Sequence, residues 1–244
     1  MKRAIGMIPV VKPTCLVVVP GLGEIILGLA AAKGKEFVAS IEELLVGAAP
    51  VPPRMMKAFQ ELGIRIICGY GLTEGANLSS ANYDSAARPE SMGKIFPGQE
   101  YKFVNKELWL RGDNIMLGYY NDPEATAAVM EDGWLKTGDL VEEDENGYIT
   151  IVGRIKNLII LGNGENVSPE EIEETFYKEN FVKDCLVKED KMNGEPVIAI
   201  EILPYGPEVE GLTPEEIQKK AEEVVAKINA TMPTFKRVTK VSVR

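Results

Sequence analysis

The sequence contains no histidine, and only three cysteines, Cys15, Cys68 and Cys185, occur among its 244 residues. Without histidine the chain cannot form a Ser-His or Cys-His catalytic pair, or a histidine-ligated metal site, from its own residues. An odd number of isolated cysteines is not a disulfide framework and is typical of a reducing compartment. We therefore expect a cytoplasmic protein whose chemistry depends on carboxylates, hydroxyls, backbone groups and cations.

Positive charge and long apolar stretches are also scarce. The chain has 27 Lys and Arg against 37 Asp and Glu, a net charge of −10. Such a surface repels a nucleic-acid backbone, so we expect no nucleic-acid partner, although backbone N–H groups and a few cations can still bind one nucleotide. Residues 14–32 are mostly apolar but include Pro20, Glu24 and several glycines. We expect a strand and a helix there and no transmembrane segment.

The first third of the chain alternates between strand and helix patterns. Short apolar runs predict strands at 15–19, 43–46 and 64–68. Helices are predicted at 24–32 and at 53–62, the second with Met56, Phe59 and Leu62 on one face. Gly34 and Gly63 are placed to end these helices. Strand, helix and strand joined by short links form a βαβ unit, so the three strands should be parallel, and the first should be buried.

The remaining two thirds predict a different architecture. Residues 75–150 favour antiparallel β structure with one short helix, on strand patterns at 100–104, 107–111 and 148–152 and a helix pattern at 123–130. Residues 155–244 predict a compact α+β module with a strand at 158–161, a turn at 162–164 and strands at 183–188 and 196–203. Its two helices should each begin with a capping box, at Ser168 and at Thr213.

The predicted fold class is therefore α/β and α+β. A partial parallel βαβ sheet and an antiparallel β region, residues 1–154, are followed by a small α+β C-terminal domain, residues 155–244.

Two sharp bends follow neighbouring parallel strands, Gly47-Ala48-Ala49-Pro50 and Gly69-Tyr70-Gly71-Leu72-Thr73-Glu74. Ligands of α/β sheets bind at the carboxyl ends of strands, so both bends should face one crevice. Glycines allow a close approach of backbone to ligand, and Tyr70 offers a ring on which a purine can stack. Thr73 offers a hydroxyl to phosphate, and Glu74 offers a carboxylate to Mg²⁺. A plain strand-to-loop turn with a buried tyrosine is an equally good interpretation.

Three further motifs are weaker. Asp139, in Thr137-Gly138-Asp139, is expected in a loop before a hairpin, where its carboxylate could accept from two ribose hydroxyls; a simple Gly-Asp turn is the commoner explanation. Arg154 could donate its planar fork to ribose or phosphate, or belong to a solvated linker. Gly162-Asn163-Gly164-Glu165-Asn166 could present its backbone to a substrate, or be an ordinary hairpin turn.

Taken in chain order, these motifs resemble those of the adenylate-forming superfamily, which holds acyl-CoA synthetases, luciferases and peptide-synthetase adenylation domains. The similarity extends over residues 13–244, and the chain resembles fatty-acyl-CoA ligases more than adenylation domains. It rests on the two bends and on Arg111-Gly112 with Met116–Tyr120, on Gly133–Asp139, on Gly153–Asn157 and on Gly164–Glu173.

The resemblance implies two half-reactions. ATP and a carboxylic acid, here a fatty acid, give an acyl-adenylate and pyrophosphate, and the thiol of CoA then takes the acyl group and releases AMP. Binding of ATP or AMP, Mg²⁺ and CoA is implied with them.

The resemblance also assigns roles. The bend of Gly47, Ala48, Ala49 and Pro50 would line the adenine pocket together with Gly69, Tyr70 and Gly71. Thr73 and Glu74 would be the catalytic contacts to phosphate and Mg²⁺, and Asp139 would bind the ribose with help from Arg154. Residues 1–154 would belong to the large adenylate-binding domain and residues 155–244 to a small mobile one. Lys156 would be the hinge between them, and Gly162, Gly164 and Glu165 would line the CoA tunnel.

Two expected features of that family are missing from the sequence. A Ser/Thr/Gly-rich phosphate loop with its lysine does not precede the matched region, and no Gly-Lys pair follows Met232–Lys236. We therefore expect the isolated chain to be a poor catalyst, and a lost subdomain would leave apolar surface for self-association. The alternatives are a non-catalytic nucleotide-binding or interaction fragment, and one half of a split ligase.

Overall fold

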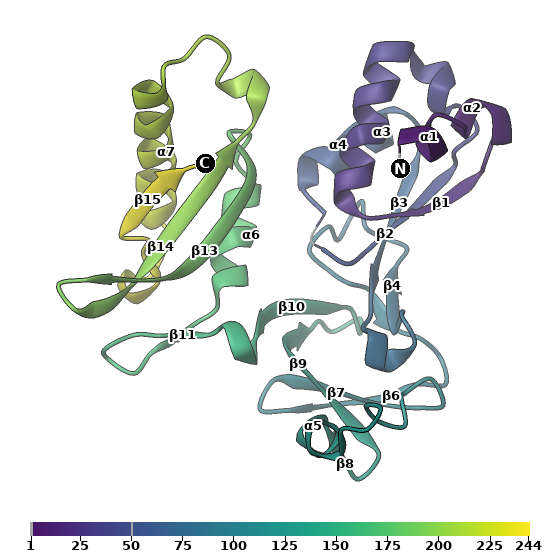
Figure 1. Ribbon diagram of the computed structural model, residues 1–244, viewed down its shortest axis with the longest axis vertical. Coiled ribbons are helices and arrows are strands. Elements are labelled where there is room, and N and C mark those ends of the chain that lie inside the picture. The colour runs from purple at the N-terminus through teal and green to yellow at the C-terminus, as the bar shows by residue number, and fades with distance from the viewer. Residues whose placement is uncertain (1, 50) are drawn as a thin grey trace. The chain divides into compact units, whose positions relative to one another are not determined.

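The computed structural model describes residues 2–49 and 51–244, which form two compact units (Figure 1). The first unit contains the chain up to Thr137 together with Val141–Ile151, and the second contains Gly138–Leu140 and Val152–Arg244. Pro50, predicted as part of the first bend, lies outside the described residues. No helix in the described part of the chain has the length and hydropathy that crossing a bilayer requires.

A five-stranded sheet forms the first part of the N-terminal unit, in the order β1-β2-β3-β4-β5. Strands β1 (Cys15–Val18), β2 (Glu43–Val46) and β3 (Arg65–Tyr70) are parallel. Strands β4 (Ser80–Asn82) and β5 (Lys94–Ile95) continue the sheet in antiparallel fashion. The links between the parallel strands are α3 (Pro20–Lys33) and α4 (Pro53–Glu61), as the sequence pattern predicted. Two short helices, α1 (Lys2–Ile5) and α2 (Ile8–Val11), precede β1.

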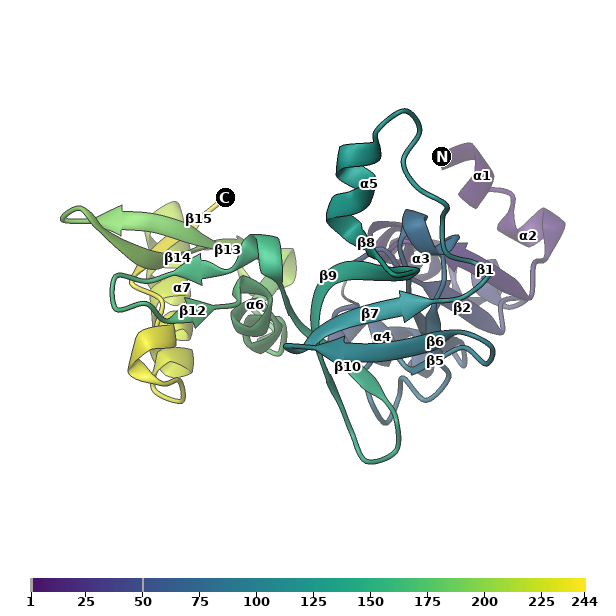
Figure 2. The same ribbon diagram turned by 90° about the horizontal axis from the view of Figure 1, so that it is seen from below.

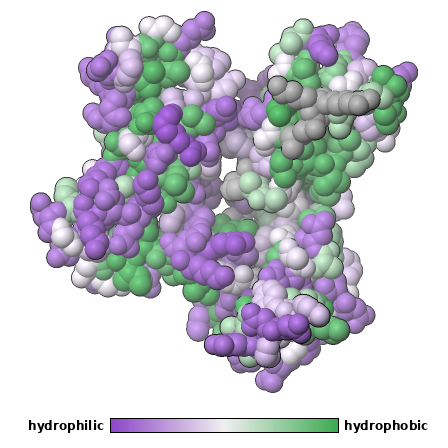
Figure 3. Space-filling model, viewed as in Figure 1, coloured by the Kyte–Doolittle hydropathy of each residue, from purple (hydrophilic) through white to green (hydrophobic). Residues whose placement is uncertain are grey.

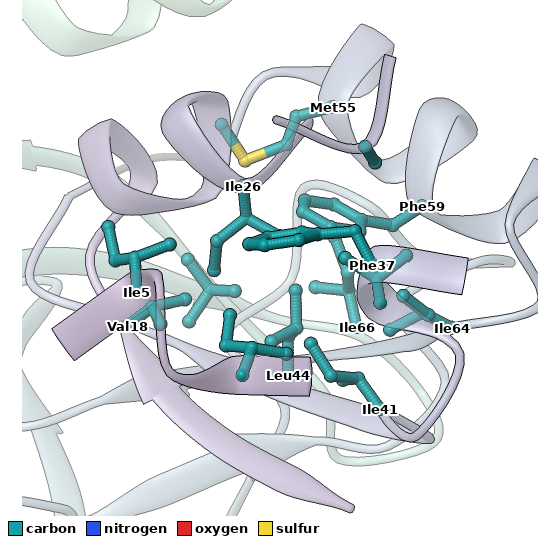
Figure 4. Packing of buried hydrophobic residues seen from close by; sticks show 14 of the residues in the cluster. Ile5, Val18, Ile26, Phe37, Ile41, Leu44, Met55, Phe59, Ile64 and Ile66 are labelled. Atoms are coloured by element: carbon teal, nitrogen blue, oxygen red, sulfur yellow. The ribbon is translucent and has the colours of Figure 1, made fainter. Parts of the chain in front are cut away.

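The core of this sheet lies between the strands and the two connecting helices. Figure 4 shows Ile26 of α3 and Met55 and Phe59 of α4 over Leu44 and Ile66 of the strands. Phe59 and Leu44 are fully buried, which explains the apolar spacing of α4 and β2. The prediction of a buried first strand is wrong in part. Val18 packs into the core, whereas Val17 lies on the opposite face of the sheet and is 73% exposed.

The antiparallel region of the chain is a second sheet, in the order β10-β9-β7-β6. Its strands are β6 (Glu100–Val104), β7 (Glu107–Arg111), β9 (Trp134–Glu143) and β10 (Ile149–Arg154), with β8 (Met130–Glu131) paired to β9 and α5 (Pro123–Val129) preceding β8. The Lys102 ammonium lies 4.6 Å from the ring centroid of Trp109 and 4.3 Å from that of Trp134. The attraction between the ammonium and both ring faces favours the arrangement in which the two indoles lie beside Lys102.

The C-terminal unit has an α+β architecture (Figure 2). Strands β13 (Val182–Met192) and β14 (Glu195–Pro204) form a long hairpin, and β15 (Lys240–Val243) pairs in parallel with β14. Helices α6 (Pro169–Tyr177) and α7 (Pro214–Asn229) contribute Phe176 and Val225 to one core with Ile200 of β14. A small hairpin of β11 (Ile159–Ile160) and β12 (Asn166–Val167) comes before them. The fold class predicted from sequence is thus confirmed.

The two predicted capping boxes have different outcomes. At α7, Glu216 N–H donates to Thr213 Oγ1 at 3.3 Å, and Thr213 N–H donates to Glu216 Oε2 at 2.8 Å. At α6 the prediction is wrong, because the Ser168 hydroxyl donates to Glu170 Oε2 at 2.8 Å. Glu171, the expected partner, forms an ion pair with Lys236. At α6, contacts with other charged side chains have therefore taken the place of the two hydrogen bonds of a capping box.

Candidate functional site

The first bend follows β2 directly. Gly47 N–H donates to Val18 O at 3.3 Å, and a Cβ placed on Gly47 would lie 3.1 Å from Gly69 O. The two bends are therefore neighbours at the carboxyl ends of β2 and β3. Ala48 adopts a left-handed φ of 68°, and both Ala48 and Ala49 are exposed. This part of the chain offers backbone groups and small side chains to a ligand.

The second bend requires its glycines for reasons internal to the fold. A Cβ on Gly71 would lie 1.5 Å from Asn77 O, and one on Gly69 would lie 2.9 Å from Leu78 Cδ2. The turn folds back on itself, with Asn77 N–H donating to Leu72 O at 3.2 Å. Approach of backbone to backbone thus accounts for Gly71, whereas the sequence had suggested approach of backbone to ligand.

Tyr70 is 7% exposed and belongs to a hydrophobic cluster with Met92, Leu108 and Leu110. This is the packing of the buried tyrosine that the sequence left open as an alternative. Stacking of Tyr70 on a purine stays a prediction, and it would require the ligand to reach the ring from the bend.

Glu74 lies in a short 3₁₀ turn, Thr73–Gly75, in which Thr73 is exposed and Glu74 is half-buried. The Tyr119 hydroxyl donates to Glu74 Oε1 at 2.6 Å, and this contact raises the pKa of Tyr119. Met116 N–H donates to Glu74 O at 2.7 Å, and Asn114 Nδ2 donates to Gly75 O at 3.1 Å. Sequence reasoning missed this connection because the two partners of the side-chain bond are 45 positions apart.

The residues present suit a Mg²⁺ ion carried by a nucleotide. No group of three or more acidic, cysteine or histidine side chains in the described residues could enclose a metal. Glu74 offers one hard carboxylate oxygen on a partly exposed turn. Mg²⁺ is commonly bound by one or two carboxylates together with substrate phosphates and water, so a single carboxylate fits this mode.

Asp139 and Arg154 lie together in the C-terminal unit. Arg154 Nε is 2.7 Å from Asp139 Oδ1, and the Asp139 side chain is 1% exposed. The prediction of a loop at Asp139 is wrong, because the residue lies within β9. Gly138 has a φ of 73° inside that strand, a conformation typical of a β-bulge, and this explains why the Gly-Asp pair resembled a turn. A buried carboxylate requires such a partner, and the guanidinium provides one.

The remaining predicted residues lie on exposed segments of the same unit. Lys156 is exposed in a 3₁₀ turn, Ile155–Asn157, which follows β10. Gly162, Gly164 and Glu165 form the exposed hairpin turn between β11 and β12. Leu161 N–H donates to Glu165 O at 3.0 Å, and Gly164 has a left-handed φ of 83°. The geometry is that of the hairpin alternative, and a role in substrate binding stays a prediction.

Comparison with known proteins gives consistent matches at both ends of the chain. A family model for AMP-binding enzyme matches residues 1–120, and one for the AMP-binding enzyme C-terminal domain matches residues 156–244. A long-chain-fatty-acid–CoA ligase of Bacillus subtilis is 34% identical over 185 residues, which are 69% of this chain and 33% of that protein. A 2-succinylbenzoate–CoA ligase of Escherichia coli is 40% identical over 134 residues, 55% of this chain and 29% of the relative.

Solved structures agree on the fold. An anthranilate CoA ligase in complex with anthranoyl-AMP superimposes with a TM-score of 0.84 at 23% identity. The match covers all of this chain and 48% of that protein. The amide bond synthetase of Marinactinospora thermotolerans also covers the whole chain, at a TM-score of 0.83 and 22% identity. The chain spans about a third of the length of the curated relatives it matches.

Proposed function

Because the chain belongs to the family of AMP-binding, adenylate-forming enzymes, we propose that it binds the adenosine part of ATP or AMP for an AMP-forming acid–CoA ligase. The observation that supports this best is the meeting of the two bends, within the matched region, at the carboxyl ends of β2 and β3. In parallel sheets that edge is where ligands bind.

The proposed division of work follows the chain. The bend of Gly47, Ala48 and Ala49 lines the adenine pocket, and Tyr70 closes it. Thr73 contacts phosphate through its hydroxyl. Glu74 would hold Mg²⁺. A bound Mg²⁺ would neutralise the negative charge that develops on the phosphates. Exposure of Thr73 and the single half-buried carboxylate of Glu74 support these assignments.

Asp139 and Arg154 are proposed to bind the ribose. A carboxylate accepts hydrogen bonds from two vicinal hydroxyls, and the guanidinium beside it both holds the carboxylate in place and can donate to the sugar. Their 2.7 Å contact supports a joint role, since each side chain limits the rotamers of the other.

Residues 155–244 are proposed as a small mobile domain that turns about Lys156 between the two half-reactions. The turn of Gly162, Gly164 and Glu165 then lines the path of CoA. Exposure of all four residues supports an encounter with substrate. We propose a fatty acid as the carboxylic acid and the cytoplasm as the compartment. The name of the Bacillus subtilis relative supports the former, and three unpaired cysteines support the latter.

Calorimetric titration with AMP tests the nucleotide site. Asp139→Asn keeps the volume of the buried side chain but removes its charge. We expect AMP affinity to fall about ten- to hundredfold, the range for hydrogen bonds to a charged group. Asp190→Asn is the matched control, because Asp190 forms an exposed ion pair with Lys240 in the same unit, outside every motif. Equal binding by wild type and Asp139→Asn would reject the ribose role, and absence of AMP binding by wild type would reject the nucleotide function.

Pyrophosphate release on addition of ATP, Mg²⁺, a fatty acid and CoA tests the ligase function. If the chain binds AMP but releases no pyrophosphate, a second candidate function is favoured. In that case the chain would be a nucleotide-binding part of a ligase that another chain completes. The short span of the chain along its relatives gives that candidate its support.

A further inference from the structure

The loop of residues 112–120 is attached to the turn that carries Glu74 at three points. Asn114 Nδ2 reaches Gly75 O, Met116 N–H reaches Glu74 O, and the Tyr119 hydroxyl reaches Glu74 Oε1. Two of these bonds fix the backbone of the turn, and the third fixes its carboxylate. The motif Met116–Tyr120 has no role in the function proposed above, yet Met116 and Tyr119 both contact Glu74 of the candidate site.

The other side of this loop is held by α5. Tyr119 N–H donates to Thr126 Oγ1 at 2.9 Å, and the Thr126 hydroxyl donates to Asp122 O at 2.8 Å. A Cβ on Gly118 would lie 2.8 Å from Thr126 Cγ2, so the loop can pass this close only with glycine there. Tyr119 is therefore held at its backbone from α5 and reaches Glu74 with its hydroxyl.

The two adjacent tyrosines have different environments. Tyr119 is 37% exposed and contacts Glu74, whereas Tyr120 is 93% exposed. Within residues 2–49 and 51–244, no ion pair involves Glu74. Its one side-chain partner is thus a neutral phenol, which orients the carboxylate without cancelling the negative charge that a cation needs. Hydrogen bonds of this type to metal-binding carboxylates commonly contribute to metal affinity.

From this geometry we infer that Tyr119 is a positioning residue, which holds Glu74 Oε1 so that the carboxylate meets the Mg²⁺ of a bound nucleotide in one orientation. The inference rests on the function proposed above. It assigns the loop of residues 112–120 to the nucleotide site as the support of its metal-binding side chain.

The test compares Tyr119→Phe with Tyr120→Phe, the same change at neighbouring positions. Calorimetry measures binding of ATP at a series of Mg²⁺ concentrations and binding of AMP in EDTA. For Tyr119→Phe we expect the Mg²⁺ concentration at half-saturation to rise about tenfold or more, the lower end of effects on metal affinity from a lost supporting bond. AMP binding in EDTA should not change, and Tyr120→Phe should behave as wild type in both titrations. An unchanged Mg²⁺ dependence in Tyr119→Phe overturns the inference.

Glu74→Gln separates this inference from the proposed function. If Glu74→Gln weakens the Mg²⁺-dependent binding and Tyr119→Phe does not, only the positioning role is wrong. If Glu74→Gln has no effect, or wild type binds no Mg²⁺-nucleotide, the metal site itself is wrong and the positioning role is rejected with it. Thermal unfolding of each variant checks that the fold is retained.

Discussion

The two units differ in where their exposed apolar residues lie. In the N-terminal unit, the sheet ends at β1, and Val10, Val11 and Val17 lie exposed around that end. Figure 3 shows hydrophobic surface gathered on this unit. In the C-terminal unit, α6 and α7 share a core with the sheet β13-β14-β15, and exposed apolar residues such as Ile160 and Leu186 are separate in sequence. Apolar residues that stay outside a core can therefore gather in one region of a unit or lie apart from one another, and only the first arrangement makes a patch.

The largest expected effect comes from emptying either core. Phe59→Ala and Phe176→Ala each remove a fully buried ring, one from each unit. Each should lower the free energy of unfolding by about 3–5 kcal/mol. Hydrogen exchange should show the loss of protection in β1–β3 for Phe59→Ala and in β13–β14 for Phe176→Ala. Loss of protection in the same strands for both variants would contradict the division into two cores.

A smaller effect separates glycines that the fold needs from glycines it does not. Gly71→Ala forces a Cβ against the Asn77 backbone and should cost about 1–3 kcal/mol. Gly28→Ala, on the exposed side of α3 with open space around it, should stabilise the unit by about 0.5–1 kcal/mol. Denaturant titration measures both changes. A tolerated Gly71→Ala would mean that the close approach in the second bend is not obligatory.

The smallest effect on folding concerns the exposed end of the first sheet. We expect wild type to self-associate through this region, since a parallel edge strand with exposed valines can pair with a second copy. Val17→Lys should reduce the concentration dependence of the mass measured by light scattering, while the unfolding free energy changes by about 0.5 kcal/mol or less. Ile160→Lys in the C-terminal unit is the control and should leave the mass unchanged. A monomeric wild type at every concentration would contradict this prediction.

The elements that the sequence predicted well are those with strong local signals. The parallel strands, α3, α4, α5 and α7 each carry an apolar period or a proline and glycine at the ends, and their bounds differ from expectation by only a few residues. Helix α3, for example, begins at Pro20, directly after the predicted strand 15–19 and four residues before the predicted helix, since proline fits the first turn of a helix. Strand β9 was missed because Gly138 in its middle imitates a turn.

Side-chain partners were much less predictable than elements. Ser168 and Thr213 begin similar motifs, but the neighbours of Ser168 in space decide its hydrogen bond. Tyr119 and Glu74 meet only because two segments far apart in sequence fold together. The Asp139–Arg154 contact was anticipated as a shared role, but the burial of the carboxylate was not. Local patterns fix the backbone, whereas burial and pairing depend on tertiary contacts that a single sequence does not encode in any one segment.

The indole pair on the antiparallel sheet has a practical consequence for spectroscopy. Trp109 and Trp134 are the protein's only two tryptophans, and both belong to the N-terminal unit. The intrinsic tryptophan emission should change when the N-terminal unit unfolds, because Lys102 then moves away from the rings. Unfolding of the C-terminal unit should leave that emission unchanged. A tryptophan placed at Tyr177, whose hydroxyl donates to Asp184 at 2.9 Å, would give the C-terminal unit an emission signal of its own.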